Sequence, residues 1–233
     1  MHFVWEELGE ILFPPTCLAC AEVLPAASFF CEDCVDNLER LPPAHCVLCA
    51  EPGAFGNRRC PRCAIRPPPF VRAFAPFAHE GPIARAIHQF KYEDHPELAP
   101  GLARLLVSET AGLFSKALVV CAIPLHEARF RERKYDHAQL FAGAVARLTK
   151  RALVQALTRW RATRRQVGLS EAGRELNVAG AFRASREIQK ERVLLIDDVF
   201  TTGATARAAA DALLIAGAQS VEVLTLARAF SPG

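Results

Sequence analysis

Continuous apolar runs lie mainly in the part of the chain after residue 67. Ala117–Ile123 and Arg192–Ile196 are almost uninterrupted, a pattern typical of strands buried on both faces of a parallel sheet. Weaker alternation and shorter apolar runs predict three further strands, at Phe70–Ala78, Ala152–Trp160 and Val221–Ala229.

Helices are predicted between these strands. After the turn at Gly81-Pro82, the apolar residues Ile83, Ile87 and Phe90 recur at helical spacing. Further helices are predicted at Pro96–Ser115, Ala138–Leu148 and Thr205–Ala216, the last closed by Gly217 as its C-cap. Arg161–Gly180 has poor periodicity and many polar residues, so it is predicted to be a long mobile loop. Strands that alternate with helices predict an α/β fold with a mostly parallel sheet and right-handed crossovers.

The chain before residue 67 has a different composition. Short segments are punctuated by prolines and cysteines, and helical periodicity is visible only at Phe3–Phe13. Pro67-Pro68-Pro69 forms a stiff linker, so we expect a Cys-rich domain at residues 1–66 and an α/β domain at residues 67–233. No apolar run is long enough to cross a bilayer, and Met1–Glu7 lacks the features of a secretory signal. We therefore expect a cytoplasmic protein without membrane insertion.

Eight of the nine cysteines fall within the first 63 residues as four Cys-x-x-Cys pairs. Ten residues separate the two pairs within each half, which indicates a duplicated unit. Two such pairs brought together by a hairpin complete a tetrahedral thiolate site suited to Zn²⁺. We predict two structural zinc ions, one per half, bound by Cys17, Cys20, Cys31 and Cys34 and by Cys46, Cys49, Cys60 and Cys63. The ninth cysteine, Cys121, lies mid-strand and is expected to be a small buried residue.

Other roles for the cysteine pairs are less well supported. Cys-x-x-Cys also occurs in redox proteins, but four tandem copies without a neighbouring βαβ pattern argue against redox chemistry. The simplest role of zinc is to fold a segment with too few apolar residues to fold alone. Nucleic-acid binding is disfavoured because residues 1–70 hold five basic and nine acidic side chains. A docking or dimerising role fits this charge better, unless Arg58, Arg59, Arg62 and Arg66 gather on one face.

The net charge of +3 conceals one basic stretch. Residues 127–192 hold 16 basic and seven acidic side chains, so an anionic ligand is expected there.

The string from Val193 to Thr205 carries the most specific chemistry of the chain. An apolar strand is followed by Asp197-Asp198, a short Thr/Gly loop and a helix. Backbone N–H groups of such a loop and the positive end of the helix dipole suit a phosphate. The two carboxylates fall at the carboxyl end of a sheet strand, where open α/β sheets place their ligands. They could accept hydrogen bonds from ribose hydroxyls, directly or through Mg²⁺.

This string resembles the signature of type I phosphoribosyltransferases. The resemblance implies that Asp197 and Asp198 bind the ribose of 5-phosphoribosyl-1-pyrophosphate (PRPP) and that the loop binds its 5′-phosphate. The implied loop residues are Val199, Thr201, Thr202, Gly203, Ala204 and Thr205. It also implies a pyrophosphate side, for which we expect Leu125, His126, Arg129, Arg133, Arg164 and Arg174.

The order of motifs over nearly the whole chain is similar to the ComF family. These motifs are the four cysteine pairs, Phe90-Lys91-Tyr92, Pro124-Leu125-His126 with Arg129 and Arg133, Gln166–Leu169 with Arg174 and Asn177, and the terminal signature. The resemblance implies a double zinc ribbon ahead of a phosphoribosyltransferase domain, and a link to DNA uptake or to the handling of single strands. We expect His79, His88, His95 and His137 to be surface or capping residues.

Three functions remain open at this stage. The first is Mg²⁺-dependent transfer of phosphoribose from PRPP to a nitrogen acceptor. The second is a non-catalytic PRPP sensor or single-stranded-DNA adaptor, with Trp160 available for base stacking. The third is a zinc-ribbon scaffold that docks on a partner such as a competence or DNA-processing protein.

Overall fold

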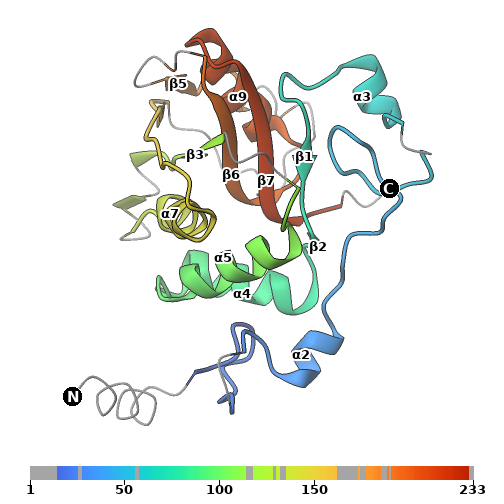
Figure 1. The fold of residues 1–233 in the computed structure, drawn as a ribbon, viewed down its shortest axis with the longest axis vertical. Coiled ribbons are helices and arrows are strands. Elements are labelled where there is room, and N and C mark those ends of the chain that lie inside the picture. Colours follow the sequence, from blue (N-terminus) through green and yellow to red (C-terminus); the bar gives the residue numbers. More distant parts are fainter. Residues whose placement is uncertain are drawn as a thin grey trace.

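The parallel sheet predicted from the sequence forms the centre of the structure, a computed structural model (Figure 1). It describes residues 15–25, 28–55, 58–113, 118–127, 130–131, 135–161, 173, 177–184, 188 and 190–230. The predicted helix Phe3–Phe13 and most of the predicted loop Arg161–Gly180 lie outside these residues.

All strand pairs of the central sheet are parallel. Its order is β1 (Ala73–Phe74), β7 (Ser220–Arg228), β6 (Arg192–Phe200) and β3 (Leu118–Ala122), and β2 (Phe77–Ala78) also pairs with β7. The short strands β4 (Leu157–Arg159) and β5 (Phe182–Ala184) form a separate antiparallel pair. The prediction of an α/β fold with a mostly parallel sheet is therefore confirmed.

The helices of the described residues are α2 (Glu32–Asp36), α3 (Pro61–Ile65), α4 (Gly81–Tyr92), α5 (Leu98–Glu109), α7 (His137–Thr149) and α9 (Ala204–Ile215). Four of them, α4, α5, α7 and α9, lie where the periodicity predicted them, whereas the short α2 and α3 were not predicted. Gly217 follows the end of α9 with a φ of 103°, as expected for a glycine beyond a helix C-cap. None of the helices in the described ranges is long and apolar enough to cross a membrane.

Three predicted strands have different bounds in the structure. The strand expected at Phe70–Ala78 is divided into β1 and β2, because Pro76 has no N–H group to donate to a strand ladder. The strand expected at Ala152–Trp160 is reduced to β4 and a single bridge between Leu153 and Val120. In contrast, β6 continues past Ile196 to Phe200, so both aspartates lie within the strand.

Strand β6 is buried on both faces. Leu194 and Ile196 belong to one apolar cluster, which is completed by α4, α5 and α7. Val193 and Leu195 belong to a second cluster, to which α9 contributes. Because successive side chains of a strand point to opposite faces, this alternation divides the core into two layers.

Each Cys-rich half packs into a different one of these clusters. Cys17, Leu18 and Phe30 of the first half lie in the cluster of α4 and α5. A Cβ atom at Gly101 of α5 would lie 3.1 Å from the Leu18 side chain, so the small glycine permits this close contact. The four cysteines of the second half lie in the cluster of α9. Figure 1 shows the two halves at separate places on the α/β domain, marked by α2 and α3.

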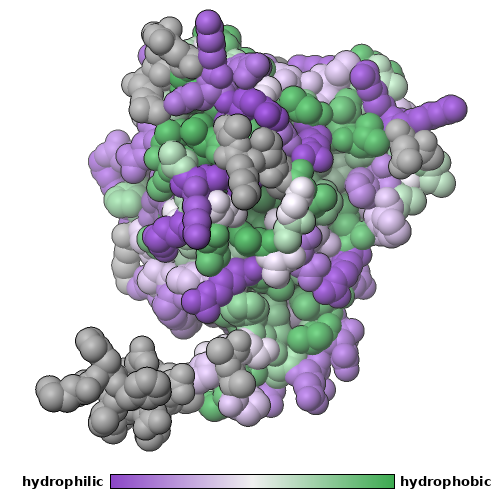
Figure 2. Space-filling model, in the orientation of Figure 1, coloured by the Kyte–Doolittle hydropathy of each residue, from purple (hydrophilic) through white to green (hydrophobic). Residues whose placement is uncertain are grey.

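The proline linker is fixed to the α/β domain. Arg207 of α9 donates hydrogen bonds to the carbonyl oxygens of Arg66 and Pro67, each at 3.0 Å. The domain boundary after residue 66 stays a prediction. Hydrophilic and hydrophobic side chains are interspersed over the visible face of the molecule (Figure 2).

Candidate functional site

A cavity of about 640 Å³ opens at the carboxyl ends of β3 and β6. Such an edge is where open α/β sheets bind their ligands. Its lining residues include His79, Lys91, Leu125, His137, Arg159, Asp197, Asp198, Val199, Thr201, Gly203, Thr205 and Thr225. The structure therefore brings together most of the string predicted to bind phosphoribose.

The phosphate loop, Thr201–Thr205, turns from β6 into α9 beside this cavity. Gly203 has a φ of 79°, and a Cβ atom there would lie 2.5 Å from the Phe200 ring, so both backbone conformation and space require glycine. Thr201 and Thr205 line the cavity with Gly203. Backbone N–H groups at the start of α9 and these two hydroxyls are suited to a phosphate.

Two of the predicted loop residues do not line the cavity. Thr202 is 6% exposed, and its hydroxyl accepts a hydrogen bond from the N–H of Ala204 at 3.4 Å. Thr202 thus stabilises the first turn of α9, and Ala204 is buried beside it.

The two aspartates have different environments. Asp198 Oδ1 lies 2.8 Å from Lys91 Nζ, and Asp198 Oδ2 lies 3.1 Å from His137 Nε2. Asp197 Oδ1 accepts a hydrogen bond from the N–H of Asp198 at 2.9 Å. Both oxygens of Asp198 are therefore engaged by charged or polar side chains, whereas the contact of Asp197 Oδ1 is to the backbone.

These environments shift the pKa values of the pair in opposite directions. Burial raises the pKa of Asp198, but Lys91 and His137 outweigh it and hold this pKa well below its usual range. Burial, and then the neighbouring charge of Asp198, raise the pKa of Asp197 to about 7. A ligand that brings a cation to Asp197 would therefore favour the ionised form of this carboxyl group.

Lys91 and His137 were not predicted as site residues. Lys91 lies in the last turn of α4 and His137 begins α7, and both helices cover the face of the sheet that carries Asp198. Phe90-Lys91-Tyr92 stood out in the sequence as a family motif, but no spacing showed that Lys91 reaches an aspartate more than 100 residues away.

The prediction that the four histidines are surface or capping residues is wrong for His137, which is 3% exposed and bonded to Asp198. His79 is also partly buried, and it lines the cavity. Burial, and then the charge of Lys91, lower the pKa of His79. His88 is exposed and His95 is half-buried, and each lies beside a glutamate.

The expected pyrophosphate side is only partly visible. Leu125 lines the cavity, whereas His126 does not. Arg129, Arg133, Arg164 and Arg174 lie outside the described residues. Arg159 of β4, which was not predicted, lines the cavity and lowers the pKa of Asp197 by its charge.

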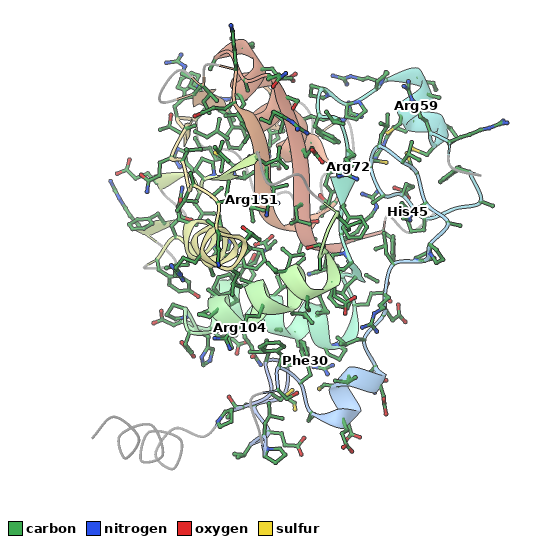
Figure 3. The ribbon with its side chains drawn as sticks, in the orientation of Figure 1. Phe30, His45, Arg59, Arg72, Arg104 and Arg151 are labelled. Carbon is green, nitrogen blue, oxygen red and sulfur yellow. The ribbon has the colours of Figure 1, made fainter. Side chains whose placement is uncertain are left out.

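The eight paired cysteines form two tetracysteine sites, as predicted. Within each site the four sulfur atoms lie within 4.8 Å of one another. Cys20 and Cys31 Sγ are 3.6 Å apart, and Cys49 and Cys60 Sγ are 3.7 Å apart. A tetrahedral ion with Zn–S bonds of about 2.3 Å needs sulfur atoms separated by ~3.8 Å. Both sites are therefore consistent with structural zinc, and Phe30 and His45 mark their two halves in Figure 3.

The first cysteine of each site has a lowered pKa. Burial raises the pKa of Cys17, but backbone N–H groups of Ala19, Cys31 and Cys20 lower it to about 7. Burial likewise opposes the N–H groups that lower the pKa of Cys46 to about 7. Thiolates bind zinc, so these hydrogen bonds favour the metal-bound form. Cys121 is 1% exposed within β3, as expected.

Comparisons with known proteins find two matching domain families in the chain. The double zinc ribbon domain family matches residues 8–64, and the phosphoribosyl transferase domain family matches residues 137–231.

Similar proteins span nearly the whole chain. DNA utilization protein YhgH from Escherichia coli (strain K12) is 32% identical over 223 residues, 92% of this chain and 97% of that protein. Competence protein F from Haemophilus influenzae is 27% identical over 223 residues, 91% of this chain and 96% of that protein. Competence protein ComFC from Bacillus subtilis is 26% identical over 209 residues, 85% of this chain and 83% of that protein.

The raised pKa of Asp197 predicts a pH-dependent gain in stability for Asp197→Asn. The folded protein holds this proton up to pH about 7, whereas the unfolded chain loses it near the ordinary aspartate pKa of 3.8. The wild type therefore loses stability as the pH rises between these two values. The Asn variant does not, so its melting temperature should exceed that of the wild type by more at pH 8 than at pH 5. Each kcal/mol corresponds to about 2–4 °C at this chain length.

Thermal melts in Mg²⁺-free buffer measure this difference. Asp36→Asn, at an exposed position in α2, is the control and should show no such trend. A shift of the same size at both pH values would contradict the assignment of the raised pKa to Asp197.

The two zinc sites should differ in their rate of metal release. Cys20 of the first site is exposed, whereas all four cysteines of the second site are buried. We expect a chelator to remove zinc in two phases, with the first site emptying at least about tenfold faster because the metal must become accessible.

Release is followed with a colorimetric zinc indicator. Cys20→Ser should abolish the fast phase, and Cys121→Ser, which changes a cysteine outside both sites, should preserve both phases. A single phase in the wild type, or a fast phase that survives in Cys20→Ser, would show that exposure does not control release.

Proposed function

The chain belongs to the ComF/YhgH family, in which a double zinc ribbon is joined to a phosphoribosyltransferase domain, and on this premise we propose that it binds PRPP with Mg²⁺ and transfers phosphoribose to a nitrogen acceptor. The observation that carries the proposal is the shared cavity of Asp197 and the phosphate loop. A carboxylate for ribose hydroxyls and a glycine-containing loop at a helix N-terminus are what a ribose 5-phosphate requires.

Several residues of the cavity have a role in this proposal. Thr201, Gly203 and Thr205 bind the 5′-phosphate, and Asp197 accepts hydrogen bonds from the ribose hydroxyls. Asp198 holds Lys91 and His137 in place and so fixes the helices around the site. Arg159 supplies positive charge on the pyrophosphate side, where Arg129, Arg133, Arg164 and Arg174 stay predictions.

Mg²⁺ suits this arrangement. The ion prefers carboxylate oxygens and often binds together with a phosphorylated substrate. Asp197 offers such an oxygen, and its raised pKa reflects a negative charge that a cation would compensate. When bound, Mg²⁺ would screen the charge of the pyrophosphate leaving group.

The proposed transfer breaks the bond from ribose C1 to the pyrophosphate oxygen and forms a bond from C1 to the acceptor nitrogen. The electron pair leaves with pyrophosphate, and the acceptor nitrogen loses a proton. Positive charge on the leaving-group side stabilises the charge that develops there. The ribose hydroxyls, held by Asp197, keep C1 oriented between the two groups.

The relatives support a biological setting. Their names, DNA utilization protein and competence protein, favour a role of this chain in DNA uptake or utilisation. Paired reduced cysteines that form metal sites are typical of a reducing compartment, which supports a cytoplasmic location.

A second candidate, an adaptor for single-stranded DNA, is favoured by the surface beside the cavity. Trp160 is 50% exposed, and Arg183 Cζ lies 4.0 Å from its ring centroid. Exposed aromatic rings with neighbouring arginines can stack on bases and contact the DNA backbone.

Asp197→Ala should weaken PRPP binding measured by isothermal titration calorimetry with Mg²⁺. The variant removes the carboxylate presented to the ribose, and we expect a loss of affinity of at least about tenfold, as for a charge-assisted hydrogen bond worth roughly 1.5–3 kcal/mol. Asp211→Ala is the matched control, because Asp211 is an exposed aspartate of α9 that does not line the cavity. Absence of binding by the wild type would overturn the proposed function.

The adaptor function makes a different prediction. Single-stranded DNA should bind in a salt-dependent manner, lose several-fold affinity in Trp160→Ala and keep its affinity in Asp197→Ala. Fluorescence anisotropy of a labelled oligonucleotide measures this binding. Equal affinities of the wild type and Trp160→Ala would remove the support for this candidate.

A further inference from the structure

Arg228, the last residue of β7, is buried where an arginine is uncommon. Only 1% of the residue is exposed, and its backbone pairs with that of Phe200, the last residue of β6. A buried guanidinium needs neighbouring groups that compensate its charge, so the groups that contact Arg228 indicate its role. Arg228 does not line the cavity, and any effect on a ligand there must pass through other residues.

On one side, Arg228 contacts the second zinc site, formed by Cys46, Cys49, Cys60 and Cys63. Its guanidinium forms an ion pair with Glu51, which follows the first Cys-x-x-Cys pair of this half, Cys46 and Cys49. The Glu51 carbonyl accepts a hydrogen bond from the N–H of Cys46 at 2.7 Å, and the Glu51 N–H lowers the pKa of Cys49. Glu51 is thus fixed by two of the four metal ligands.

The charge of Arg228 also reaches these ligands directly. Glu51, its ion-pair partner, is hydrogen-bonded through its carbonyl to Cys46, and the positive charge of Arg228 also acts on Cys49. A zinc tetrathiolate carries a formal charge of about −2. Arg228 therefore compensates Glu51 and the metal site together.

On the other side, Arg228 contacts the base of the phosphate loop. Its Cζ lies 5.0 Å from the centroid of the Phe200 ring, which is 4% exposed. The same ring fills the space in which a Cβ atom at Gly203 would lie, at 2.5 Å. The position of the Phe200 ring consequently limits the backbone conformation of the phosphate loop at Gly203.

Apart from the contact of its Nη2 with Glu51, the donor atoms of Arg228 do not fix its position. Nε and Nη1 are buried and have no hydrogen-bond partner among the residues that the structure describes. The remaining attachments are the ion pair with Glu51 and the stacking on Phe200. A shift of Glu51 would therefore move the Arg228 guanidinium and, with it, the contact with the Phe200 ring.

We propose that Arg228 is a positioning residue that couples the second zinc site to the phosphate loop. The zinc-bound half holds Glu51, Glu51 holds Arg228, and Arg228 holds the Phe200 ring beneath Gly203. This inference rests on the proposed function, since it concerns the loop assigned to the 5′-phosphate.

Glu51→Gln tests the coupling from its zinc end. The substitution removes the charge that holds Arg228, keeps the backbone contacts to the cysteines, and changes a residue that does not line the cavity. We expect the Kd for PRPP with Mg²⁺, measured by calorimetry, to rise roughly five- to tenfold, in the range typical of coupling between two sites. Zinc content should stay at two ions per chain, as a metal assay can verify.

Arg228→Met and the double variant complete the test. Arg228→Met should raise the Kd at least as much as Glu51→Gln, and the double variant should match Arg228→Met, because both changes interrupt one connection. Arg72→Met is the matched control. This substitution breaks the ion pair between Arg72 and Glu222, which lies near the start of β7. It should leave the Kd for PRPP unchanged.

Amide hydrogen exchange of Thr201–Thr205 tests the coupling without ligand. Exchange should be faster in Glu51→Gln and Arg228→Met than in the wild type and Arg72→Met. If the wild type does not bind PRPP, the proposed function fails, and this measurement still decides the coupling. Wild-type exchange and wild-type Kd in Glu51→Gln would overturn the inference, and so would additive effects of the two substitutions.

Discussion

The burial of β6 on both faces determines where the other parts of the molecule lie. Leu194 and Ile196 contact one cluster and Val193 and Leu195 the other, so the strand needs a cover on each side. Helices α4, α5 and α7 cover the first face and α9 covers the second. Because the strand continues through Asp198, the same covering helices bring Lys91 and His137 to its carboxylate.

The adjacent residues Asp197 and Asp198 thereby lie in different electrostatic environments. Two like charges at neighbouring positions cannot both be stable in a partly buried site unless cations compensate them. Protein groups compensate Asp198, whereas Asp197 keeps a raised pKa and faces the cavity. One carboxylate therefore organises the protein around the site, and the other remains available to an incoming ligand. The chemical identity of the pair alone does not distinguish them.

Local patterns predicted the elements and the metal sites well. The apolar run before Asp197, the helical spacing of Ile83, Ile87 and Phe90, and the cysteine intervals are short-range features, and each corresponds to the observed structure. Lys91, His137 and Arg159 could not be found in this way, because their roles depend on which elements meet in space. Asp198 and His137 are 61 residues apart, and no local periodicity reports such a contact.

The shared cores of the Cys-rich halves have a consequence for biosynthesis. Cys17 and Cys46 leave the ribosome long before β6, yet their apolar neighbours include helices and strands of the later domain. During that interval the nascent halves lack the surfaces on which they finally pack, and metal coordination is the main source of order within them. Zinc supply during translation would then influence how much chain reaches the native state, even where the mature protein no longer exchanges its metal.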